Sequence, residues 1–420
     1  MSTTTASPDL RSAPPASLVT VAPAAPAVRP ATYRDVFRVA EFRSLFWADL
    51  TSLLGDQVAA VALAVLLYQR TGSPLAAALG YSTAFLPWAI GGPLLAAWAD
   101  RLPPRRILVG CDVARAALIG CAAIPGMPLP VLGLLVLAAA MLAPPFDASR
   151  SALLPQVLAG DRYTVGMSVR DAVHQSAQLA GFVGGGALVV LISARSALAL
   201  DAVTFACSAM LLRRGIRPRP AALAGVARQP LVAEAAQGLR IVAADRRLYG
   251  PLLLGVAGVA YAVVPEAIAP AYAAQLGHGA GWVGLIMAAV AAGSVLGALV
   301  MGRLVRPELR RRLMWPLALA GAAPLVLAGL RPEPVITLVL LVVAGATTAF
   351  QLTANAAFAT AAPPAARGRA FGIANAAIHS AQGLAVIAAG ATAQILSPST
   401  VVAGAALLGA LAVLPLRRTR

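Results

Sequence analysis

About twelve long apolar stretches constrain this chain more than any other feature of its sequence. Each holds roughly 18–26 predominantly apolar residues, and about 20 are needed to cross the hydrocarbon core of a bilayer. With 59% hydrophobic and 12% charged residues, the composition lies outside the range of soluble globular domains. The sequence therefore predicts an all-helical membrane protein. The expected spans are residues 44–68, 75–98, 107–124, 130–148, 164–192, 195–212, 249–271, 281–302, 313–330, 335–356, 370–395 and 399–416.

The connections between these spans predict two bundles of six helices. The loops on one side are very short, as at residues 69–74, so sequential helices should be antiparallel neighbours. A long basic stretch separates the sixth span from the seventh, and within it Leu231–Arg240 is expected to form a helix on the membrane surface. The expected regions are a disordered tail, an N-terminal bundle, a cytoplasmic linker, a C-terminal bundle and a short tail, at residues 1–42, 43–212, 213–248, 249–416 and 417–420.

The distribution of basic residues predicts the topology. All 33 are arginine. About 29 fall in the tails and one set of loops, about three in the other set, and Arg115 lies within a span, which is the bias expected of cytoplasmic loops. Both termini should therefore be cytoplasmic, and the lysine-free, alanine-rich composition is typical of a GC-rich bacterial genome, so we expect the bacterial inner membrane. The net charge of +17 then indicates contact with anionic lipid rather than nucleic acid.

A weak internal repeat relates the two expected bundles. The tripeptide Ser176–Gln178 of the fifth span recurs as Ser380–Gln382 in the eleventh. Repeated halves, here offset by about 204 residues, are how many secondary transporters build a site at the midplane of the membrane.

Several short motifs carry a family resemblance. The basic loop Asp100–Arg106 joins the second and third spans, and the glycine-rich stretch Gly181–Gly186 lies in the fifth. Three further motifs are Ser52–Asp56, Arg150–Pro155 and Leu200–Phe205. With these motifs the chain resembles the major facilitator superfamily of transporters, in the branch of macrolide and enterobactin exporters. The resemblance implies twelve transmembrane helices in two pseudo-symmetric six-helix bundles that work by alternating access.

The chain also departs from the pattern of that family. Ala96 and Pro104 replace two glycines that are usual around the basic loop, and residues 130–146 lack the arginine that proton-coupled exporters often carry in the fourth span. The resemblance implies a conformational latch in the basic loop, whose residues here are Asp100, Arg101, Arg105 and Arg106. The alternative is that these charges only set the topology.

Four ionisable residues within the spans are the candidates for proton coupling. Such groups cost about 2.5–3.5 kcal/mol at the bilayer centre, and desolvation favours the protonated form of a carboxylate. Asp56 lies in the middle region of the first span, where it either takes up protons or hydrogen-bonds a neighbouring helix. Asp112 and Arg115, one turn apart, form either a structural ion pair or a tuned proton site. Glu266, between two prolines, lies either at a gate or near the outer surface.

Polar stripes and aromatic residues supply the candidates for a substrate cavity. Residues spaced i, i+3 or i+4, and i+7 share one face of a helix, and polar faces turn away from lipid. They line a central cavity or form hydrogen bonds between helices. The candidates are Asp49 and Ser52 in the first span, His174 and Gln178 in the fifth, Asn375, His379 and Gln382 in the eleventh, and the apolar walls Phe85, Trp88 and Phe350.

The function predicted from these features is secondary active transport, as proton-coupled efflux of an amphipathic drug, antibiotic or other natural product. The alternatives are an importer of a small nutrient, a siderophore exporter, and, more remotely, a channel or a sensor. The sequence lacks a phosphate-binding loop and the common hydrolase motifs, so we expect no enzyme activity. The expected partners are a small-molecule substrate, protons and membrane lipid, bound by a monomer without cofactor or metal.

Overall fold

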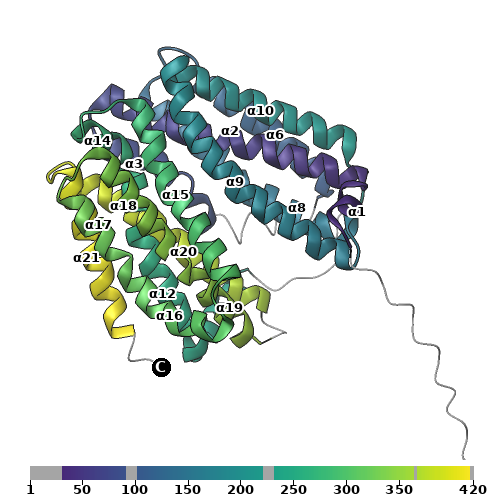
Figure 1. Cartoon of the computed structure of the whole chain (residues 1–420). Helices are drawn as coiled ribbons and strands as arrows, with labels where there is room; N and C mark the ends of the chain where they lie inside the picture. The colour runs from purple at the N-terminus through teal and green to yellow at the C-terminus, as the bar shows by residue number, and fades with distance from the viewer. Residues whose placement is uncertain (1–30, 91–101, 221–230, 364–366, 417–420) are drawn as a thin grey trace, which may run out of the picture.

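The structure is a computed structural model of the chain that describes residues 31–90, 102–220, 231–363 and 367–416. Helices lie in the described part of each of the twelve expected spans (Figure 1). In the described residues, nine helices or pairs of consecutive helices are long and apolar enough to cross a membrane. Of the other three expected spans, 75–98 runs beyond the described residues, and 107–124 and 164–192 carry more polar side chains. The predicted all-helical membrane fold is confirmed.

The N-terminal half is organised around one long helix, α2, which packs along α9 and α10. Its buried side, from Val58 to Leu67, is almost entirely apolar and forms the core of this half with residues of α3, α6 and α10. The helices of this half are α1 (Tyr33–Phe37), α2 (Ala40–Thr71), α3 (Pro74–Ser82), α4 (Leu86–Ile90), α6 (Pro104–Ala122), α7 (Leu129–Ala140), α8 (Ala143–Val157), α9 (Asp161–Leu191) and α10 (Ala194–Gly215).

The C-terminal half packs α15 along α18, and α21 along α12 and α17. Close approach of α15 to α18 depends on Gly293 and Gly297, because a Cβ atom at either position would overlap backbone atoms of α18. The helices of this half are α12 (Arg246–Ala262), α13 (Val264–Ala267), α14 (Ala269–Gln275), α15 (Ala280–Arg303), α16 (Pro307–Ala320), α17 (Ala322–Gly329), α18 (Pro334–Thr347), α19 (Phe350–Ala361), α20 (Arg367–Thr392) and α21 (Pro398–Leu416).

Several spans are built from consecutive shorter helices. In the seventh, Pro265 and Pro270 lie in the first turns of α13 and α14, where a residue without an amide hydrogen is tolerated but the preceding helix cannot continue. The fourth and tenth spans break at Leu142 and Ala349, corresponding places in the two halves. The repeat suggested by the sequence is therefore also visible in the helix breaks.

The two halves touch at one end of the molecule, which we call the closed end. There α9 crosses α15 at Gly186, and a Cβ atom on this glycine would lie 3.0 Å from the Cα atom of Gly284. The contact between α3 and α20 includes a hydrogen bond of 2.7 Å from Gln394 Nε2 to Ser73 Oγ. Away from the closed end the two halves diverge toward the opposite end of the molecule, where α1 begins and α21 ends, and we call this the basic end (Figure 1).

The linker between the halves contains the expected helix, α11 (Leu231–Ala244). It packs on α20, where Arg369 Nη1 donates a hydrogen bond of 2.7 Å to Gln237 Oε1. At the start of the linker, Arg219 Nη2 donates to the Glu41 carboxylate at 2.6 Å. The linker is thus anchored to both halves, whereas its placement on a membrane surface stays a prediction.

Candidate functional site

A cavity of about 370 Å³ lies between the halves, below the closed end, and we call it the central cavity. Its walls come from α2, α3, α4, α6, α7, α8, α9 and α10 of the N-terminal half, and α20 adds His379 from the C-terminal half. Most of the lining is apolar. Its ionisable and amide side chains are Asp56, Gln57, Tyr81, Arg115, His174, Gln178, Asp201 and His379.

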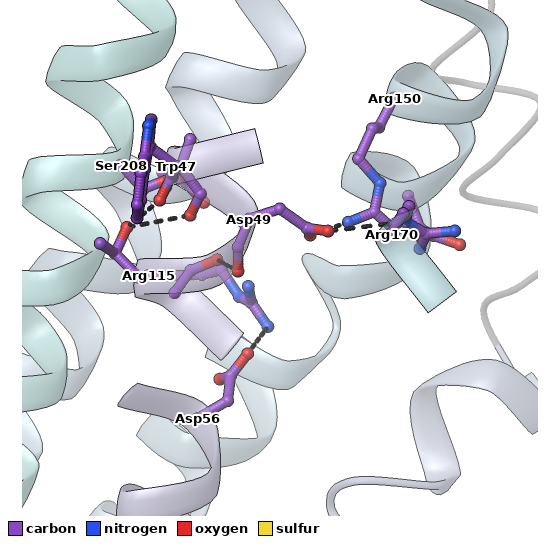
Figure 2. Close-up of polar contacts among 12 residues, drawn as sticks. Trp47, Asp49, Asp56, Arg115, Arg150, Arg170 and Ser208 are labelled. Carbon is purple, nitrogen blue, oxygen red and sulfur yellow. Dashed lines mark hydrogen bonds and ion pairs between the residues drawn. The ribbon is translucent and has the colours of Figure 1, made fainter. Parts of the chain in front are cut away.

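An ion pair joins Asp56 of α2 to Arg115 of α6 across this cavity (Figure 2). Arg115 Nη2 lies 3.7 Å from Asp56 Oδ2, and the Asp56 side chain is 40% exposed whereas that of Arg115 is 9% exposed. Two further contacts hold the guanidinium: its Nε donates to Ala139 O at 3.3 Å, and it lies 4.4 Å from the ring centre of Phe205. The cation is therefore fixed by three helices, while the carboxylate is open to the cavity.

Asp112 has a different partner from the one its spacing suggested. The Ser208 hydroxyl of α10 donates to Asp112 Oδ2 at 2.5 Å, and within the described residues no salt bridge joins Asp112 to Arg115. Asp112 is fully buried, whereas the longer side chain of Arg115 extends to α2. The structural ion pair within α6, one of the two predicted arrangements, is replaced by contacts between helices, and the other, a tuned proton site, stays a prediction.

Asp201 of α10 is a cavity residue that was not among the predicted site residues. It is 1% exposed, and the Thr204 hydroxyl donates to its Oδ1 at 3.2 Å. Gly55 makes this position possible, since a Cβ atom there would overlap Asp201 and Thr204. The signal in the sequence is the same one that marked Asp56, a carboxylate within an apolar span.

Asp49 belongs to a second cluster of charges at the basic end (Figure 2). Arg150 of α8 pairs with Asp49 and Asp147, and Arg170 of α9 lies 3.5 Å from Asp49 and 3.4 Å from Asp147. The cluster ties α2, α8 and α9 together within one half. Ser52 is buried and donates to the carbonyl oxygen of Asp49 at 3.2 Å, so neither residue lines the central cavity.

Arg150 also changes the interpretation of the fourth span. The apolar helix pair continues to Val157, so Arg150 lies within it rather than after residue 148. Its side chain is 11% exposed. The fourth span therefore contains an arginine, close to its basic end.

Aromatic side chains pack around His379 of α20, which is the residue that the C-terminal half contributes to the described lining of the cavity. The His379 ring packs edge-on against Phe85 and Trp88, with centroid distances of 6.4 and 5.6 Å. Its Nδ1 is buried without a hydrogen-bond partner in the described residues. His174 and Gln178 of α9 also line the cavity. These five predicted cavity residues are brought together, and their contact with substrate stays a prediction.

Other predicted residues lie elsewhere. In α20, Asn375 is exposed and Gln382 half-buried, and the lining of the central cavity includes neither. Phe350 is fully buried in the core of the C-terminal half, where its ring packs onto Gly258, so it is not a cavity wall. Glu266 of α13 lies at the contact between the halves, where its Oε2 accepts a hydrogen bond of 2.5 Å from the Tyr81 hydroxyl of α3.

Half of the predicted latch can be placed. Asp100 and Arg101 lie outside the described residues. Arg105 is half-buried and donates to the carbonyl oxygen of Arg213 near the end of α10, and Arg106 is exposed. A cation at the C-terminus of a helix is favourable, and the contact joins α6 to α10 within one half. The role of these four residues as a latch stays a prediction.

Comparison with known proteins places this fold and cavity in a family. The model of the Major Facilitator Superfamily matches residues 45–349 and 255–420. The chain belongs to this superfamily. Major facilitator proteins are membrane transporters, and the chain is a transporter of small molecules rather than an enzyme.

Similar proteins include multidrug efflux pumps and solved structures of other transporters. The multidrug efflux pumps Tap of Mycobacterium tuberculosis and Mycobacterium bovis are 28% identical to the chain over 371 residues, which cover 82% of the chain and 85% of Tap. A bacterial homologue of the iron transporter ferroportin, in its inward-facing state, has a TM-score of 0.66 at 15% identity. The match covers 92% of the present chain and 99% of the homologue. The nucleoside transporter NupG has a TM-score of 0.70 at 14% identity, covering 90% and 98%. These structures support the major facilitator fold.

Proposed function

We propose that this major facilitator protein exports amphipathic small molecules in exchange for protons. The central cavity supports the proposal most directly, since it combines aromatic and aliphatic walls with one accessible carboxylate, Asp56. Apolar walls with a few placed polar groups are typical of sites for drug-sized molecules. The similarity to Tap, a multidrug efflux pump, supports export.

Alternating access is supported by the asymmetry of the two ends. The arginine bias assigns the basic end to the cytoplasm. The halves diverge toward that end and touch at the other, which supports a state that admits substrate from the cytoplasm (Figure 1). Release to the outside then requires the contacts at Gly186 and between Tyr81 and Glu266 to open.

The Asp56–Arg115 pair is the proposed coupling element. A proton on Asp56 neutralises the carboxylate and weakens its contact with Arg115. The Arg115 guanidinium stays in place because Ala139 O and the Phe205 ring still hold it. Protonation of Asp56 therefore changes the net charge of the cavity without moving Arg115. Binding of a proton and binding of substrate are thereby linked through one accessible group.

A susceptibility assay tests the proposal. The chain is expressed in bacteria that lack their own major efflux pumps, and growth inhibition is measured for a panel of amphipathic antibiotics and dyes. We expect resistance and lower cellular accumulation for some compounds, and loss of both with Asp56→Asn. Glu333→Gln is the matched control, because it removes one carboxylate from an exposed position outside the cavity. Increased accumulation on expression, or full resistance with Asp56→Asn at equal protein level, would contradict the proposal.

A further inference from the structure

A second cavity, larger than the central one, lies in the C-terminal half. Its volume is about 1110 Å³. It is formed at the basic end, where α12 and α16 begin and α15 and α19 end. It shares no lining residue with the central cavity, and the proposed transport mechanism does not use it.

The rim of this second cavity carries four guanidinium groups. Arg310 donates to the carbonyl oxygens of Val305 and Gly302, both at 2.8 Å, and is thereby held in place. The other three are exposed, and none of them forms a salt bridge within the described parts of the chain. They are Arg246, Arg247 and Arg311.

No acidic side chain is among the described residues that line this cavity. The neighbouring Asp245 caps α12, where its Oδ1 accepts a hydrogen bond of 2.8 Å from the Arg247 backbone amide. The described lining of the cavity therefore supplies no carboxylate that would neutralise the arginines at the rim. Guanidinium groups bind phosphate in bidentate geometry, so a phosphate group is a suitable counterion.

The wall beyond the arginines is mostly apolar, with Thr353 and Thr360 as its polar side chains. Pro251, Met301, Ala356 and Ala357 line it, together with Leu352, which is 50% exposed. A small inorganic anion would leave this surface in contact with water, whereas an acyl chain attached to the phosphate would cover it. The basic end also faces the leaflet in which anionic lipids attract arginine, if both termini are cytoplasmic.

We propose that this cavity binds an anionic phospholipid, with its phosphate at the arginine rim and the first part of an acyl chain along the Leu352 wall. The described lining of this site shares no residue with that of the central cavity. Lipid bound there would link α12, α15, α16 and α19 at the end of the half that must move during alternating access.

Native mass spectrometry of the purified full chain tests this site. The protein is titrated with phosphatidylglycerol, and with phosphatidylcholine as a zwitterionic lipid of the same chain length. The variant is Arg246→Gln/Arg311→Gln. The matched control is Arg214→Gln/Arg312→Gln, which removes the same charge from exposed arginines that do not line the cavity. Each arginine near an anionic headgroup contributes about fivefold to affinity, so the first variant should bind phosphatidylglycerol about thirtyfold more weakly.

The expected result is a selective loss of phosphatidylglycerol in the cavity variant, with wild-type binding in the control. Equal binding by both variants, or equal affinity of the wild type for the two lipids, would overturn the proposal. A second arm adds glycerol phosphate at millimolar concentration. If glycerol phosphate displaces the lipid at the same concentration at which it binds the wild type but not the Arg246→Gln/Arg311→Gln variant, the cavity is a site for a soluble anion instead.

Discussion

The crossing of α9 and α15 at the closed end allows the proposed conformational change to be tested with a single methyl group. A Cβ atom at Gly186 would lie 3.0 Å from Gly281 O, 3.0 Å from Gly284 Cα and 3.2 Å from Gly284 N. These are backbone atoms of the other half and cannot move aside by a rotamer change. In Gly186→Ala the two helices must therefore separate by several tenths of an ångström wherever the closed end is formed.

The size of the effect follows from that overlap. Overpacking of a tight contact costs about 1–3 kcal/mol. The cost applies only to the state in which the halves touch at this end, so the ratio of closed to open molecules should fall by about 5-fold to 150-fold. Gly184→Ala is the control, because a Cβ atom at Gly184 meets no atom within 4 Å. Both changes replace glycine within α9 and so alter helix propensity equally.

Distances between two spin labels across the closed end measure this shift. The labels are placed at Leu191 and Ile395, which are 77% and 88% exposed, after replacement of the three native cysteines. We expect double electron–electron resonance to show a longer-distance population in Gly186→Ala that is absent from the parent and from Gly184→Ala. Identical distance distributions in all three proteins would refute the assignment of this crossing as the contact that opens.

Two further changes test a polar contact between the halves and a charge cluster within the N-terminal half. Tyr81→Phe removes the hydrogen bond to Glu266. A hydrogen bond contributes about 0.5–1.5 kcal/mol, so the same labels should report about a twofold to tenfold shift toward opening. An unchanged distance distribution would exclude a gating role. Arg150→Gln leaves Asp49 and Asp147 with Arg170 alone and should cost about 2–3 kcal/mol, below the 3–5 kcal/mol typical of buried pairs because Asp147 is 33% exposed. A thermal unfolding midpoint equal to that of an Arg214→Gln control would contradict this.

The helices could be predicted because lipid leaves a chain few options. In a bilayer every backbone polar group must be bonded within the protein, so an apolar run of the right length is a helix. The limits were less certain where charge enters a span. Arg150 marked the apparent end of the fourth span, yet the helix continues because Asp49 and Asp147 neutralise it from within the bundle.

The partners of the site residues were the part that the sequence could not supply. Helical periodicity identifies neighbours one turn away and therefore suggested Asp112 for Arg115. The actual ion-pair partner, Asp56, lies on another helix, and its proximity depends on how α2 and α6 pack. In the same way, the polar stripe of α20 predicted three cavity residues, but only His379 is in the described lining. The spacing of residues in the sequence predicts which of them share a face of the helix. It does not predict how far along that face a cavity extends.

Transport into inverted membrane vesicles tests the central claim most directly. The vesicle lumen is made acidic, and uptake of a fluorescent compound from the susceptibility panel is followed with and without a protonophore. We predict accumulation that requires the pH gradient and disappears in Asp56→Asn, while Glu333→Gln retains it. Uptake of equal extent after collapse of the gradient, or gradient-driven uptake that persists in Asp56→Asn, would contradict proton-coupled export through the Asp56–Arg115 pair.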